Sequence, residues 1–187
     1  MKLLGKAENL DLLKKIFKKT KLKIPNYFYF YKKNFFKDKK KIIIRIKQFS
    51  KKNKLIIRSS AADEEGKKFT NAGKYSSKII QKNSDIEDIE FFLNNYIKQF
   101  RSMNDKIIIQ EFIEKVNISG VIFTKDINLD VPYYLINYDE SGKTHLITSG
   151  VENDKKKQIV IYKKNIKKNK FNNLLKACIC LEKFLKN

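Results

Sequence analysis

The stretch LIIRSS, residues 55–60, places an arginine and two serines directly after a short apolar run. The chain has 42 basic residues, and only three of them are arginine. A guanidinium can bind two phosphate oxygens at once, which an ammonium cannot do, and serine hydroxyls can donate to the same oxygens. Arg58, Ser59 and Ser60 are therefore candidate ligands of a phosphate group. Alternatively, Arg58 pairs with one of the acidic residues at 63–65 and fastens the loop.

Two further segments suggest nucleotide chemistry. Gly5 and Lys6 stand at the start of an expected helix, where free N–H groups, a close backbone approach and a lysine charge would favour an anion. This is not the GxxxxGK[ST] pattern of a Walker A loop, and the alternative is a solvated lysine. The run IIIQEFIE, residues 107–114, includes the polar pair Gln110-Glu111. Its backbone could hydrogen-bond a purine edge, or it could be an ordinary amphipathic strand.

Composition predicts a folded protein rather than a disordered chain. Apolar residues make up 42% of the 187 residues, and 14 Phe and 9 Tyr supply many aromatic rings. No apolar stretch approaches the roughly 20 residues that span a bilayer, and the first residues do not resemble a signal peptide. Cys178 and Cys180 are two residues apart, which fits neither a disulfide framework nor a CxxC motif. We therefore expect a cytoplasmic protein with free thiols and no membrane contact.

The formal charge of +22 has two interpretations. It can mark a surface for nucleic acid or anionic lipid. It can also reflect a lysine-rich composition spread over solvated faces. The scarcity of arginine favours the second interpretation, because nucleic-acid interfaces usually draw on arginine. Weak, salt-sensitive binding to polyanions is expected in either case.

Periodicity predicts helices separated by short strands. The helical segments are 5–19, 35–50, 84–100 and 171–187, and the strands are expected within 23–33, 54–60, 106–114, 118–126 and 132–140. A hairpin turn leading into another strand is expected at 139–150. Helices followed mostly by strands indicate an α+β fold.

Two details of these helices can be tested directly. The second helix should bury Phe36, Ile43, Ile44 and Phe49 on its apolar side. The third should begin with a Ser84 cap, because Glu87 follows three residues later in a capping-box pattern.

Four segments, in this order, resemble a known family: GKAENL, LIIRSSAADEEGKKFTNAGKY, IIIQEFIEKVNISGVIFTKD and PYYLINYDESGKTHLITSG. They are similar to the N-terminal ATP-grasp domain of phosphoenolpyruvate synthase and pyruvate phosphate dikinase. The resemblance implies a mixed, largely antiparallel sheet with flanking helices. It also implies a single incomplete domain over 1–187, with an N-terminal lobe over about 1–105 and the hinge strand and second lobe over about 106–187.

The resemblance also implies roles for individual residues. Lys6 and Arg58 match phosphate-contacting and catalytic positions, and Ser59 belongs to the same motif as Arg58. Gly73 matches a phosphate-loop glycine, and Thr124 matches a residue that lines the nucleotide cleft. The remaining matches form the hinge strand that hydrogen-bonds adenine, namely Gln110, Glu111, Phe112 and Ile113.

This sequence also departs from the family pattern. Leu4 and Ala7 replace two glycines of the phosphate loop. The family's magnesium-binding Asp-x-Glu strand would follow the last helix, where this sequence ends at Asn187. The Asp-Ile-Glu triplets within 85–90 match in type but not in place, and helix-start carboxylates explain them. The only histidine, His145, does not match the family's phosphate-accepting histidine.

The resemblance therefore implies the ATP-binding portion of a phosphotransferase that passes phosphate to a histidine on another domain. Its ligand would be ATP, with Mg²⁺ in the intact family enzyme but without that enzyme's metal ligands here. A second chain or a further domain would supply the metal site and the histidine. The alternative is a catalytically inactive, basic module that binds polyanions or nucleic acid, or a degenerate fragment.

Overall fold

The computed structural model describes residues 4–18, 20–61, 77–125, 131–142, 144, 156–164, 166 and 169–186. The chain divides into two compact units. Unit 1 comprises Met1–Lys15 and Lys23–Phe112, and unit 2 comprises Ile16–Leu22 and Ile113–Asn187. Each unit has its own sheet and its own hydrophobic core.

The described residues form an α+β fold with four helices and two antiparallel sheets. The helices are α1 (Lys6–Phe17), α2 (Lys32–Ser50), α3 (Ile86–Ile97) and α4 (Asn172–Lys186). The strands are β1 (Tyr27–Tyr31), β2 (Leu55–Ser60), β3 (Lys78–Ile80), β4 (Lys106–Glu111), β5 (Ser119–Phe123), β6 (Tyr133–Asp139) and β7 (Lys156–Tyr162). None of the helices in this part of the chain is long and apolar enough to cross a membrane.

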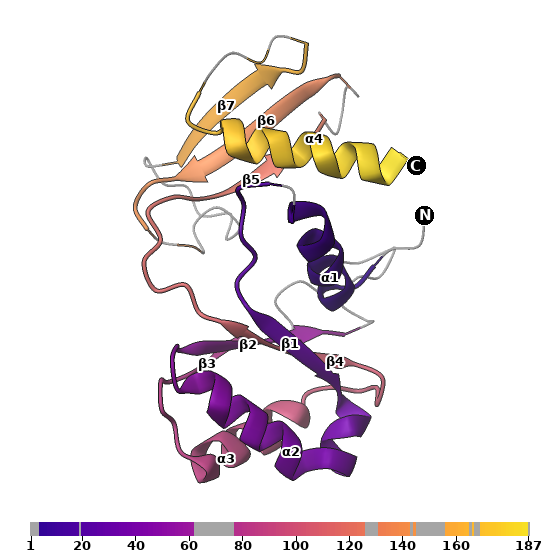
Figure 1. Ribbon diagram of the computed structural model, residues 1–187, viewed down its shortest axis with the longest axis vertical. Coiled ribbons are helices and arrows are strands. Elements are labelled where there is room, and N and C mark those ends of the chain that lie inside the picture. Colours follow the sequence, from indigo (N-terminus) through magenta and orange to yellow (C-terminus); the bar gives the residue numbers. More distant parts are fainter. Residues whose placement is uncertain are drawn as a thin grey trace. The chain divides into compact units, whose positions relative to one another are not determined.

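Unit 1 contains a four-stranded sheet in the order β1-β4-β2-β3. β4 lies between β1 and β2 and pairs antiparallel with both, so it forms the centre of the sheet. Helices α2 and α3 cover one side of this sheet, and α1 lies on the other side (Figure 1). Branched and aromatic side chains of alternate strand positions pack with both covering helices in one core.

Strand alternation divides the sheet residues between these two sides. The side that faces α2 and α3 includes Leu55, Ile57, Ile107 and Ile109, all fully buried. We call the opposite side the α1 face. It consists of three rows of paired residues, namely Tyr27–Gln110–Ile56, Tyr29–Ile108–Arg58 and Tyr31–Lys106–Ser60.

Unit 2 contains a three-stranded antiparallel sheet, β5-β6-β7, with α4 packed on one side. The rings of Tyr138 and Phe171 meet edge to face, with their centroids 5.0 Å apart. Glu182 of α4 accepts a hydrogen bond from the Tyr134 hydroxyl at 2.8 Å and forms an ion pair with Lys163. One carboxylate therefore connects the helix to two positions at the sheet.

The predicted apolar side of the second helix was right for Ile43, which is buried, and for Phe49, which packs against the core, but wrong for Phe36 and Ile44. Phe36 is 63% exposed and Ile44 is 50% exposed, whereas Phe35, Ile42 and Ile46 are buried. The buried residues keep ordinary helical spacing, although the helix has non-helical backbone angles at Asp38 (φ −123°, ψ 32°). Phe35, Ile42 and Ile46 therefore lie on the buried side of the helix, and Phe36 and Ile44 lie on its exposed side.

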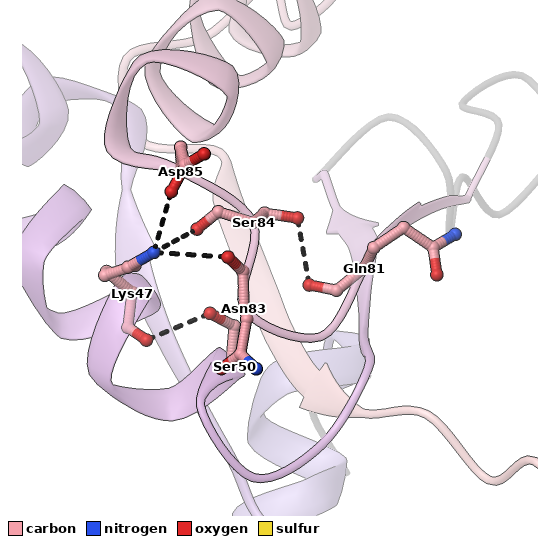
Figure 2. Close-up of polar contacts among 6 residues, drawn as sticks. All are labelled: Lys47, Ser50, Gln81, Asn83, Ser84 and Asp85. Carbon is pink, nitrogen blue, oxygen red and sulfur yellow. Dashed lines mark hydrogen bonds and ion pairs between the residues drawn. The ribbon is translucent and has the colours of Figure 1, made fainter.

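The predicted Ser84 cap was also wrong. The residue that precedes α3 is Asp85, and neither side chain caps the helix. Figure 2 shows that the Ser84 hydroxyl instead donates to the Gln81 carbonyl, at 2.9 Å. The loop before α3 is held by the Lys47 ammonium, which donates to the carbonyls of Asn83 and Ser84 at 3.2 and 2.8 Å. A lysine of α2 thus fixes the loop that a local cap was expected to fix.

Strands β3 and β7 were not predicted, because each is a short apolar run among lysines. Most of the hairpin expected at 139–150 lies outside the described residues. The other predicted helices and strands are present with bounds within a few residues of those expected.

Candidate functional site

The start of α1 contacts the end of β2. The backbone N–H of Ala7 donates to the Ser60 hydroxyl at 3.1 Å, although the two residues are 53 positions apart. Ala7 is 0% exposed and Ser60 is 8% exposed, so this is a buried bond. N–H groups in the first turn of a helix have no partner within the helix, and Ser60 satisfies one of them from another segment.

Gly5 makes this close approach feasible. The Gly5 carbonyl accepts the first bond of α1, from the Asn9 N–H at 2.9 Å. A Cβ at Gly5 would lie 3.1 Å from the Ser60 oxygen and 2.8 Å from a carboxylate oxygen of Glu8. A side chain here would therefore require the Glu8 carboxylate and the Ser60 hydroxyl to shift.

Two tyrosines and an aspartate fix α1 over the sheet. The hydroxyls of Tyr27 and Tyr29 donate to the two carboxylate oxygens of Asp11, at 2.7 and 2.9 Å. Burial, together with the bond to Asp11, raises the pKa of Tyr27, and the bond to Asp11, together with burial, raises the pKa of Tyr29. Both phenols therefore remain protonated donors over a wider pH range.

Lys106 lies on the α1 face, on strand β4 between Tyr31 and Ser60. Its ammonium forms an ion pair with Glu8 of α1 and lies 5.8 and 5.3 Å from the ring centroids of Tyr29 and Tyr31. Burial lowers the pKa of Lys106, whereas the Glu8 carboxylate beside it favours the charged form. This pair orients the first turn of α1, which carries Lys6.

Arg58 lies on the α1 face in the row next to Ser60 and is exposed. Lys6 lies next to Ala7, whose N–H binds Ser60. Two of the predicted phosphate ligands therefore come from segments that meet at one hydrogen bond. Ser59 is buried and, by alternation, lies on the other side of the sheet from Arg58. The acidic residues 63–65, the alternative partners of Arg58, lie outside the described residues.

The predicted hinge strand is already hydrogen-bonded on both edges. The N–H of Glu111 donates to the Asn26 carbonyl and the N–H of Phe112 donates to the Lys54 carbonyl, both at 2.9 Å. The Glu111 carboxylate accepts bonds from the Asn26 and Asn53 side chains at 3.0 and 2.9 Å. Glu111, at the end of β4, therefore binds the loops that precede β1 and β2.

The other hinge residues differ in burial and in the unit to which they belong. Gln110 is buried on the α1 face, in the same row as Ile56, whereas Ile113 is exposed and begins unit 2. Thr124 is half-buried and follows β5 in unit 2. Gly73 and His145 lie outside the described residues.

The acidic triplets within 85–90 have structural partners. Asp85 pairs with Lys47 at 3.2 Å, and Glu90 pairs with Lys39 at 2.5 Å, so both connect α3 to α2. Within the described ranges, no group of three His, Cys, Asp or Glu side chains is placed to hold a metal ion. The triplets therefore do not form such a group, and two of their carboxylates, Asp85 and Glu90, hold the two helices together.

Sequence reasoning missed the residues that orient α1, namely Asp11, Tyr27, Tyr29 and Lys106. The alternation in YFYFY was the available signal, since it puts the tyrosines on one side of a strand and the phenylalanines on the other. Their partner Asp11 could not be found in this way, because the contact joins a helix to a strand across a loop.

The chain is thus an α+β protein whose unit 1 has a helix-covered sheet face that includes Arg58 and Lys106. Comparison with protein-family models gave no match, and comparison with curated proteins gave none either. The function therefore has to follow from the chemistry of the site itself.

Proposed function

We propose that this chain is the ATP-binding portion of a phosphotransferase of the phosphoenolpyruvate synthase type, with an ATP-grasp fold. ATP phosphates would lie where β2 ends against the start of α1. One observation carries the proposal: the bond from the Ala7 N–H to Ser60 brings together two segments that each contain a predicted phosphate ligand, Lys6 and Arg58. Because these segments are far apart in the chain, their contact is specified by the fold, which supports a shared role.

The chemistry of this junction suits a polyphosphate. Arg58 offers a planar fork of donors, and Lys6 adds a compact positive charge at a helix start. The Ser60 oxygen accepts the Ala7 N–H and still has its own proton to donate. Such groups would act by positioning the phosphates and neutralising their charge as the terminal bond breaks. In the intact family enzyme, Mg²⁺ would add to this neutralisation.

The adenine base would need partners other than the two expected hinge donors. The N–H groups of Glu111 and Phe112 already have backbone partners. The proposal therefore relies on the phosphates for affinity. The phosphoryl acceptor would be supplied by another domain or chain.

The test is an ATP titration by calorimetry of the wild type and two single variants, Arg58→Ala and Arg101→Ala. Both variants remove one arginine charge from an exposed position of unit 1. A charged hydrogen bond is typically worth about 1.5–3 kcal/mol, so Arg58→Ala should weaken ATP binding by roughly tenfold or more. Arg101→Ala should leave it within about twofold of the wild type, since surface changes rarely exceed about 0.5 kcal/mol.

Equal losses in the two variants would mean that ATP responds only to net charge. That result would refute a specific phosphate site and would favour the alternative, an inactive module that binds polyanions. No measurable ATP binding in the wild type would favour a degenerate fragment.

A further inference from the structure

Helix α2 and the turn that follows it concentrate positive charge. Residues 32–52 contain ten lysines and arginines and one acid, Asp38, which gives a net charge of +9. This segment is about a ninth of the chain but has well over a third of its formal charge of +22. The charge on unit 1 is therefore far from evenly spread.

About half of these basic side chains already have a structural role. They bind a loop carbonyl, an asparagine, a carboxylate or an aromatic ring, and they are Lys32, Lys33, Lys39, Arg45 and Lys47. The Lys47 contacts in Figure 2 are the most extensive of these. Lys41 lies 3.7 Å from Asp38 in a solvent-exposed pair, which is a weak interaction.

Four lysines after the Asp38 kink form what we call the lysine face of α2, namely Lys40, Lys41, Lys51 and Lys52. All four are exposed. Eleven residues are close to three helical turns, so Lys51 lies on the same side of the helix as Lys40, and Lys52 on the same side as Lys41. The backbone stays helical at Lys51 (φ −56°, ψ −34°), so this register holds. The two pairs are separated by about 16 Å along the helix axis.

We propose that the lysine face of α2 binds the phosphate backbone of double-stranded nucleic acid. The duplex presents two rows of phosphates across a major groove about 12 Å wide, and flexible lysine side chains spaced about 16 Å apart can reach both rows. Lysines supply charge without the fork that reads base edges, so binding is independent of sequence. This surface is separate from the proposed ATP site, because α2 and α1 lie on opposite sides of the sheet (Figure 1).

Duplex nucleic acid fits this surface better than an anionic membrane does. A helix that lies in a membrane surface buries its apolar side in the lipid. The apolar side of α2, with Phe35, Ile42, Ile43 and Ile46, is already buried in the core of unit 1. The exposed side has only two large apolar residues, Phe36 and Ile44, among its lysines. Its dense positive charge matches the closely spaced phosphates of a duplex.

The test measures binding to a fluorescent 20-base-pair DNA duplex by anisotropy, at several salt concentrations. The test variant changes all four residues of the lysine face to glutamine. The matched control changes four other exposed lysines of unit 1 to glutamine, namely Lys15, Lys78, Lys82 and Lys98, and so has the same net charge. A third variant changes the lysine face to arginine, which keeps the charge.

The slope of log affinity against log salt changes by about 0.9 for each phosphate that the protein neutralises. The test variant should therefore have a slope shallower by about 3–4 and should bind at least tenfold more weakly. The control and the arginine variant should keep the wild-type slope and bind within about threefold of the wild type. Equal weakening in the test and control variants would overturn the proposal, because binding would then follow net charge alone. It would also be overturned if phosphatidylserine vesicles bound the wild type and the duplex did not.

Discussion

Replacing Ser60 with alanine should loosen the junction between α1 and β2. The hydroxyl of Ser60 is the acceptor for the Ala7 N–H at 3.1 Å, and Ala7 is fully buried. In Ser60→Ala, this buried donor would have no oxygen at that position. The first turn of α1 would lose its bond to β2 and keep only its ion pair with Lys106 of β4, so Lys6 would be held less firmly beside β2.

The structure allows the cost to be estimated. A buried donor without its partner typically costs about 1–3 kcal/mol, since it also gave up its hydration on folding. Deleting the hydroxyl leaves only a small void, so the missing hydrogen bond dominates. We therefore expect the free energy of unfolding of unit 1 to fall by about 1–3 kcal/mol.

The assay is urea denaturation followed by NMR signals of β2 and β4, with amide hydrogen exchange at Ala7 as a local measure. Ser84→Ala is the matched control, because its exposed hydroxyl donates to a loop carbonyl and not to a buried group. The control should change stability by less than about 0.5 kcal/mol. If Ser60→Ala is no more destabilising than Ser84→Ala, and exchange at Ala7 is unchanged, then Ser60 does not anchor α1.

Two further predictions concern unit 2. Hydrogen bonds from Lys157 and Lys170 lower the pKa of Glu140 to about 2, from its ordinary value of 4.5. Because the pKa of Glu140 is lower in the folded state, its contribution to stability is present above pH 4.5 and is lost as the pH falls toward 2. In acid titrations followed by circular dichroism, Glu140→Gln should remove that part of the pH dependence. An unchanged acid profile would contradict this prediction. Burial raises the pKa of the Cys178 thiol to about 11. Iodoacetamide should therefore modify the less buried Cys180 first at pH 8, which mass spectrometry of the peptides would measure. Equal rates of modification would contradict the burial of Cys178.

Local patterns in the sequence were enough to predict most of the helices and strands. The alternation of YFYFY and the apolar run before Arg58 reflect strands with one buried side, and these appear as β1 and β2. The period of Phe171, Leu175 and Cys178 reflects a helix that packs on one side, and all three are buried in α4 or just before it. Such patterns can be recognised in the sequence because each one follows from which neighbouring residues are buried.

Other features could not be predicted from neighbouring residues. Which apolar residues of α2 are buried depended on how the helix packs in the core, and the loop before α3 depended on a lysine from α2 rather than on its own serine. The hinge backbone of Glu111 was predicted to be free for adenine, but a partner segment occupies its N–H. In the loop before α3 and in the hinge strand, the hydrogen bond is made with a group that is distant in the sequence.

By itself, the sequence determined the α+β class, most of the element types and the candidate phosphate ligands, since these follow from periodicity and side-chain chemistry. Only the tertiary structure decided which of those residues share a surface. Strand pairing put Arg58 and Ser60 on the α1 face and turned Ser59 toward the core. A single buried bond then brought Ala7, and with it Lys6, to the end of β2. The physical reason is that a buried backbone donor must find an acceptor, and the one it found lay 53 residues away in the chain.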